Sequence, residues 1–152
     1  MITEPALIPA ALFAVVGAVW DVRTRRIPNW LVALLALAAA GATLGMDGWS
    51  ALGSSAIHAA IALVVGMGLF ALRAIGAGDA KFYSAAALAV PLGAALPMMG
   101  WVVASGFALL IGMAIWRRGF KVAKAGKKEG WTLPFAVPIA CGFLAVSAGL
   151  MG

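Results

Sequence analysis

Charged residues are scarce in this chain. They make up 11% of its 152 residues, against about a quarter in soluble domains. Acidic residues are the scarcest, since five Asp and Glu stand against eleven Lys and Arg, while apolar residues account for 64%. A soluble domain could not bury so large a fraction of apolar residues in its core. The composition therefore predicts an integral membrane protein, whose solvent is the bilayer.

Cysteine and histidine each occur once, as Cys141 and His58. One cysteine excludes an internal disulfide and a Cys-x-x-Cys zinc site, and one isolated histidine offers no metal centre. The sequence also contains no Gly-x-Ser-x-Gly motif, which argues against serine catalysis. We expect Cys141 to be a small buried apolar residue, His58 to be packed or hydrogen-bonded in the interior, and the protein to use no metal or cofactor.

Six apolar segments follow one another with short connections. A helix of about 20 residues crosses the hydrocarbon core, so we expect an all-α, polytopic membrane protein with about six transmembrane helices. Residues 1–152 would form a single membrane-embedded domain. The break at residues 96–98 is little more than a tight turn, which leaves four or five complete spans as alternatives. The segments lie at residues 6–20, 31–46, 52–73, 82–97, 99–116 and 134–151.

Basic residues alternate sharply between the connections. If six spans are threaded back and forth, every Lys and Arg lies on one side, in or beside the first, third and fifth connections. By the positive-inside rule that side is cytoplasmic, and both termini are non-cytoplasmic. The net charge of +6 is explained by this orientation and by contact with anionic membrane lipid, so we expect no nucleic-acid partner.

Two of the five acidic residues differ from the other three. Asp21 ends the first apolar segment and Asp79 precedes the fourth, so both lie at the cytoplasmic boundary, where a functional role is the default expectation. Glu4, Asp47 and Glu129 are expected to be solvated loop charges. Position alone leaves an alternative of equal weight, in which Asp21 and Asp79 merely pair with nearby Arg or Lys side chains.

Two carboxylates held a few ångströms apart supply what peptide hydrolysis requires. An ionised carboxylate deprotonates water, a protonated one polarises the scissile carbonyl, and mutual repulsion makes the pair share one proton. Asp79 should begin a helix and Asp21 should end one. The helix dipole would then favour Asp79 as the ionised partner and Asp21 as the protonated one.

The residues around the two aspartates form recognisable motifs. Asp21 is followed, after five residues, by Ile27-Pro28-Asn29, and Asp79 lies in Gly76-x-Gly78-Asp79-x-Lys81. The glycines permit close backbone approach and unusual dihedral angles before a helix. Together these motifs resemble those of the type IV prepilin peptidase family, including the short form of tight-adherence pili built from Flp-type pilins. The Gly-x-Gly-Asp element alone is also similar to presenilin-type intramembrane proteases, and residues 134–138 resemble the family's proline-aromatic stretch.

The resemblance covers essentially the whole chain and carries several implications. Asp21 and Asp79 would be the catalytic residues of an aspartic endopeptidase that removes the basic leader from a prepilin or pilin-like precursor at the cytoplasmic face of the bacterial inner membrane. The pilus assembly machinery is a further conceivable partner. Longer members carry a cytoplasmic Cys-x-x-Cys domain and methylate the pilin, so we expect no N-methyltransferase activity here. The motif-shaping residues would be Ile27, Pro28, Asn29, Gly76, Gly78 and Lys81.

Three points stay open at this level. Lys81 either holds Asp79 or contacts lipid phosphate, and the lipid is slightly favoured because residues two apart on a helix do not face each other. A small membrane transporter, in which the acidic pair relays protons or binds a cation, is the alternative function. A structural membrane subunit is a further alternative, which predicts full function after both aspartates become asparagine.

Overall fold

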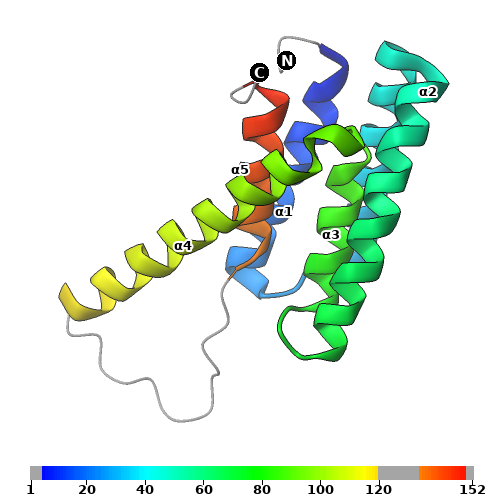
Figure 1. The fold of residues 1–152 in the computed structure, drawn as a ribbon. Coiled ribbons are helices and arrows are strands. Elements are labelled where there is room, and N and C mark those ends of the chain that lie inside the picture. Colours follow the sequence, from blue (N-terminus) through cyan, green and yellow to red (C-terminus); the bar gives the residue numbers. More distant parts are fainter. Residues whose placement is uncertain (1–4, 120–133, 150–152) are drawn as a thin grey trace.

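The protein is all-helical in the part that its computed structural model describes, residues 5–119 and 134–149 (Figure 1). No strand occurs within those ranges, which confirms the predicted all-α class. Residues 120–133, which hold four lysines and Glu129 of the basic fifth connection, lie outside the described part. The elements are η1 (Pro5–Leu7), α1 (Ile8–Thr24), α2 (Asn29–Ala71), α3 (Ala77–Ala87), η2 (Leu92–Ala94), α4 (Ala95–Gly119) and α5 (Ala136–Ser147).

The long element α2 contains two of the predicted apolar segments, joined at Gly48. Gly48 has φ 78° and ψ −171°, a conformation that is open almost only to glycine. Ile27, which precedes α2, and Arg73, which follows it, line the same cavity. The two halves of α2 therefore run in opposite directions, and the ribbon reverses at the upper right of Figure 1.

The predicted break at residues 96–98 is wrong. Pro97 lies in the first turn of α4, where a missing backbone N–H leaves no hydrogen bond unmade. The chain changes direction earlier, because α3 ends at Ala87 and Pro91 precedes η2. Pro138 is likewise accommodated in the first turn of α5.

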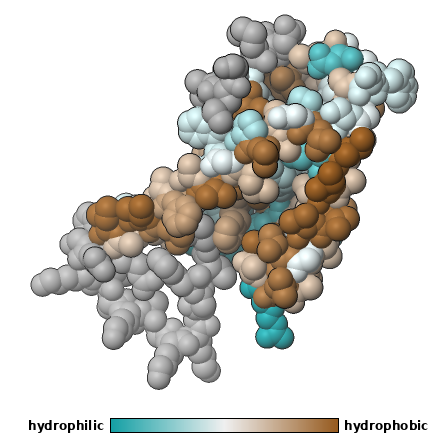
Figure 2. Space-filling view, viewed as in Figure 1, coloured by the Kyte–Doolittle hydropathy of each residue, from teal (hydrophilic) through white to brown (hydrophobic). Residues whose placement is uncertain are grey.

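Two helices among the described residues are long and apolar enough to cross a membrane, Asn29–Ala71 and Leu92–Trp116. The 11 residues of α3 and 12 of α5 are each shorter than the roughly 20 residues that a complete crossing needs. The count of six spans and the non-cytoplasmic termini therefore stay predictions. Apolar residues cover exposed faces of α2 and α4, as Figure 2 shows in brown, which is how a lipid-facing surface is composed.

Helix α3 packs closely against α1 and α2 at positions where those two helices carry glycine. A Cβ added to Gly17 of α1 would meet the ring of Phe82 at 2.5 Å, and one added to Gly66 of α2 would meet the Ala80 Cβ at 2.7 Å. Ala80 and Phe82 are both buried, at 2% and 0% exposure. Ala80 and Phe82 follow Asp79 by one and three residues, so the packing of α3 helps to determine where that aspartate lies.

Gly66 and Gly68 form a matched pair for testing this packing. Gly66→Ala places a methyl group against the Ala80 backbone, and overpacking of this kind destabilises by about 1–3 kcal/mol. Gly68 has nothing within 4 Å of an added Cβ, and alanine is favoured over glycine in a helix by about 1 kcal/mol. We expect thermal unfolding in detergent, followed by circular dichroism, to occur at a lower temperature for Gly66→Ala and at the same or a higher temperature for Gly68→Ala. Equal midpoints for both variants would contradict the close α2–α3 contact.

Candidate active site

A cavity of about 790 Å³ lies where α1, α2 and α3 meet their basic connections. Asp21 and Asp79 both line it, although 58 positions separate them in the chain. The structure thus brings the two aspartates to one cavity at the basic end of the helices. The remaining lining residues are Arg25, Arg26, Ile27, Arg73, Ala74, Ile75, Gly76, Gly78, Leu110 and Phe135.

Asp21 is buried, with 6% of its surface exposed. Its Oδ2 accepts a hydrogen bond of 3.3 Å from the backbone N–H of Ala136, the first residue of α5. Helix N-termini present unpaired N–H groups and partial positive charge, so α5 stabilises the ionised form of this carboxylate. Helix α5 therefore contributes to the site through a backbone group, and Phe135 beside it lines the cavity.

Asp79 is the third residue of α3 and is partly buried. Its Oδ2 accepts a hydrogen bond of 3.1 Å from the N–H of Gly76, the residue that caps the helix. A Cβ on residue 76 would lie 2.8 Å from that same Oδ2. Glycine at this position therefore leaves room for the carboxylate to bond its own helix terminus.

Burial and neighbouring groups shift the pKa of both carboxyl groups. Both aspartates lie outside the predicted membrane-spanning segments nearest to them, residues 6–20 and 82–97, so water rather than lipid is the reference for their pKa. Burial raises the pKa of Asp79 to about 6; the Gly76 N–H lowers it and the negative charge of Asp21 raises it. Burial also raises the pKa of Asp21, while the Ala136 N–H and Arg25 act in the opposite direction. Burial thus favours a proton on the pair as a whole, and the sequence argument overlooked the N-terminus of α5 beside Asp21.

The motif glycines act differently from each other. Neither has a positive φ, so the expected unusual dihedral angles are absent at both positions. Gly76 is required for space beside Asp79, whereas a Cβ on Gly78 would make an ordinary contact with Ile27 at 3.7 Å.

Pro28 caps α2, and its carbonyl accepts the N–H of Leu31 at 3.1 Å.

The two motifs also meet through side chains of their last residues. The Nζ of Lys81 lies 3.5 Å from the Oδ1 of Asn29, so α3 and the start of α2 are joined at the rim of the site. Lys81 is exposed, and its ammonium group lies beside Asn29 rather than Asp79. Of the two roles left open for Lys81, holding Asp79 and contacting lipid phosphate, the slightly favoured lipid contact stays a prediction.

Three arginines and an apolar side chain of α4 line the cavity without having been singled out from the sequence. Arg25 and Arg73 are the two non-glycine residues with positive φ in the described part, at 55° and 59°. This left-handed conformation costs roughly 1–2 kcal/mol for an L-residue. Their role was missed because arginine gives no turn signal, and the positive-inside rule already accounted for its charge.

The single histidine and cysteine lie away from the cavity. His58 is 3% exposed, its Nδ1 lies 3.0 Å from the carbonyl oxygen of Val90, and its ring packs edge-on against Tyr83. This confirms the interior role predicted for it. Cys141 is exposed, which corrects the expectation of burial. Among the described residues no three His, Cys, Asp or Glu side chains gather.

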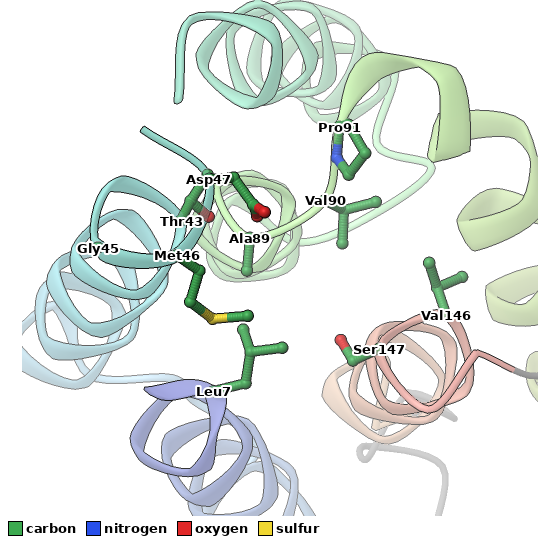
Figure 3. A pocket seen from close by; sticks show the side chains of 10 residues that line it. All are labelled: Leu7, Thr43, Gly45, Met46, Asp47, Ala89, Val90, Pro91, Val146 and Ser147. Carbon is green, nitrogen blue, oxygen red and sulfur yellow. The ribbon is translucent and has the colours of Figure 1, made fainter. Parts of the chain in front are cut away.

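Another cavity, of about 610 Å³, is lined by residues from the opposite helix ends (Figure 3). The oxygen atoms of Asp47 and Ser147 point toward its interior in that view. It contains one carboxylate, and a lone carboxylate does not provide both the acid and the base that a hydrolytic pair needs. The cavity with Asp21 and Asp79 is therefore the stronger candidate.

Residues 8–117 match the model of the type IV leader peptidase family. This range covers most of the chain and includes both aspartates and both motifs, so the protein belongs to the type IV leader peptidase family. The recognition made from the motifs is thereby confirmed at the level of the family. Comparison with curated proteins and with solved structures gives no significant match.

The coupling between the two carboxyl groups can be measured directly. In Asp21→Asn the charge that raises the Asp79 pKa is removed, so the pKa should fall from about 6 toward its usual range. The protonated carboxyl band of Asp79 in infrared difference spectra, followed against pH, reports this shift. Asp47→Asn, at the other cavity, should leave the titration unchanged, and an unchanged pKa in Asp21→Asn would show that the carboxylates are not coupled.

The same pKa shift predicts how stability varies with pH. Asp79 binds its proton more tightly in the folded protein than in the unfolded chain, whose pKa is near 3.8. Its contribution to stability is complete below pH 3.8 and is lost as pH rises through about 6. Replacing Asp79 with Asn should therefore flatten the decline in unfolding temperature across that window.

Proposed function

We propose that the protein is an aspartic endopeptidase that removes the leader from a pilin-like precursor, with Asp21 and Asp79 as catalytic residues. The observation that carries the proposal is the shared cavity, in which each carboxylate accepts a hydrogen bond from a backbone N–H at the start of a helix, Asp21 from Ala136 of α5 and Asp79 from Gly76, which caps α3. Membership of the type IV leader peptidase family supports the reaction class. The Flp-type substrate, the inner membrane and the cytoplasmic face belong to the same proposal.

The chemistry follows from the unequal environments of the two carboxyl groups. Ionised Asp21 takes a proton from water, and the hydroxide equivalent attacks the scissile carbonyl carbon. Protonated Asp79 donates a hydrogen bond to the carbonyl oxygen and transfers its proton as the tetrahedral intermediate forms. When the C–N bond breaks, the leaving amine takes the proton that Asp21 received, and the intermediate's hydroxyl returns its proton to Asp79. The pair ends in its initial state.

Replacement of either aspartate tests this mechanism. Asp21→Asn and Asp79→Asn should each lower cleavage of a co-expressed Flp-type prepilin by about a hundredfold or more, since each removes a group that acts in acid–base catalysis. The readout is the mass shift of the precursor at matched enzyme abundance in the membrane. Asp47→Asn is the matched control, because it removes one carboxylate from the other cavity.

The results separate the proposed peptidase from its rivals. Cleavage that persists in either aspartate variant would overturn the two-aspartate mechanism. A wild-type protein that cleaves no precursor, but whose proton or cation flux depends on both aspartates, would instead establish the transporter. Retention of cellular function in the double variant would establish a structural subunit.

The two motif glycines give a second test, which does not alter a catalytic side chain. Gly76→Ala places its Cβ against the Asp79 Oδ2, a flexible side-chain atom that can rotate away. The fold should persist while the carboxylate moves, so cleavage should fall about tenfold to a hundredfold. Gly78→Ala meets only an ordinary contact with Ile27 and should stay within about threefold of wild type. Equal activity of the two variants, at equal unfolding temperature, would contradict the role assigned to Gly76.

A further inference from the structure

Arg73 occupies a position where backbone geometry alone would select glycine. It follows the last turn of α2 with φ 59°. Its N–H donates to the carbonyl of Phe70 and the N–H of Ala74 donates to that of Leu69, each at 2.9 Å. This pair of bonds is the Schellman ending of a helix, and glycine is the usual residue at the left-handed position. The arginine is therefore not explained by the turn that it completes.

The side chain of Arg73 is also unexplained by contacts within the described part of the chain. It is exposed, and no ion pair or hydrogen bond of its guanidinium occurs there. A second arginine, Arg25, has the same left-handed conformation at the end of α1. It differs in that its charge acts on Asp21, so Arg25 already has a role inside the site.

Both arginines line the cavity that contains the two aspartates, and Arg26 is the third. Three arginines thus line the same cavity as two carboxyl groups, so the lining carries a net positive charge whether the pair holds one proton or none. Such a cavity favours an anionic occupant and opposes a cationic one. A guanidinium fork also matches a carboxylate through two parallel hydrogen bonds.

We propose that Arg73 is a specificity-determining residue, which binds an acidic side chain of the substrate beside the scissile bond and keeps basic leader residues out of the cavity. The inference rests on the proposed peptidase function. A peptide carboxylate is favoured over a lipid phosphate because Arg73 lines the same cavity as the aspartates, where the scissile bond must lie. The basic part of a leader then lies outside the cavity during cleavage.

The test uses the full-length protein and precursors that differ at one residue. Glu, Gln or Lys is placed in turn at each of the positions flanking the scissile bond, and kcat and KM are measured for wild type and Arg73→Gly. Glycine suits the left-handed backbone, so the variant should unfold at the same or a higher temperature. At the position that Arg73 contacts, wild type should prefer Glu over Gln by roughly tenfold or more in kcat/KM, and Lys should be the poorest.

In Arg73→Gly the preference for Glu should disappear through a rise in KM, with kcat nearly unchanged, and the Lys precursor should be cleaved better than by wild type. Arg73→Lys keeps the charge without the fork and should retain part of the preference. Arg23→Gln removes one charge from α1 at a residue that does not line the cavity, and it should leave every ratio as in wild type.

Three results would overturn the inference. Identical Glu, Gln and Lys ratios in wild type and Arg73→Gly would show that Arg73 does not read substrate charge. In a second result, Arg73→Gly loses the same fraction of kcat/KM for all three precursors, and it does so in vesicles containing phosphatidylglycerol but not in pure phosphatidylcholine. That result would assign Arg73 to lipid phosphate. A wild-type protein that cleaves none of the precursors would contradict the peptidase function itself. If wild type is active, the aspartate variants are inactive and wild type cleaves the Glu, Gln and Lys precursors equally well, only the inference about Arg73 is contradicted.

Discussion

Two carboxyl groups in one partly buried cavity repel each other, and each loses hydration that the protein must replace. The structure replaces it with backbone amides at the starts of two helices, that of Ala136 in α5 for Asp21 and that of Gly76, the residue capping α3, for Asp79. An N–H at a helix start has no partner within its own helix, so it is available for a carboxylate. The arrangement of the remaining helices serves to bring these two helix starts to the same cavity.

Small residues make that arrangement sterically possible. Gly17 and Gly66 let α1 and α2 approach α3 at contacts where a methyl group would collide. Gly142 does the same between α5 and α4, since an added Cβ would lie 2.5 Å from Val102. In a membrane the lipid is as apolar as the side chains, so helices associate through such close packing rather than through the hydrophobic effect. The positions of both aspartates therefore depend on glycines distant from them in sequence.

The sequence predicts the helical class, most helix positions and the meeting of Asp21 with Asp79. Apolar runs and the confinement of basic residues to alternate connections carry that information. The prediction failed at Pro97, because a proline in a first helical turn looks the same in sequence as one that ends a helix. It also missed the donor to Asp21, a backbone N–H of Ala136, because a backbone group carries no residue signature. The left-handed arginines were missed for a similar reason, since glycine is the expected residue at such turns.

The participation of α5 has a consequence for the time at which the site is completed. Synthesis proceeds from the N-terminus, and α5 is the last described helix to leave the ribosome. Until it docks against α1, Asp21 lacks its amide donor and one wall of the cavity, at Phe135, is missing. A nascent chain can thus insert its earlier helices while the cavity around the two carboxylates is still incomplete, and the order of translation itself delays its completion.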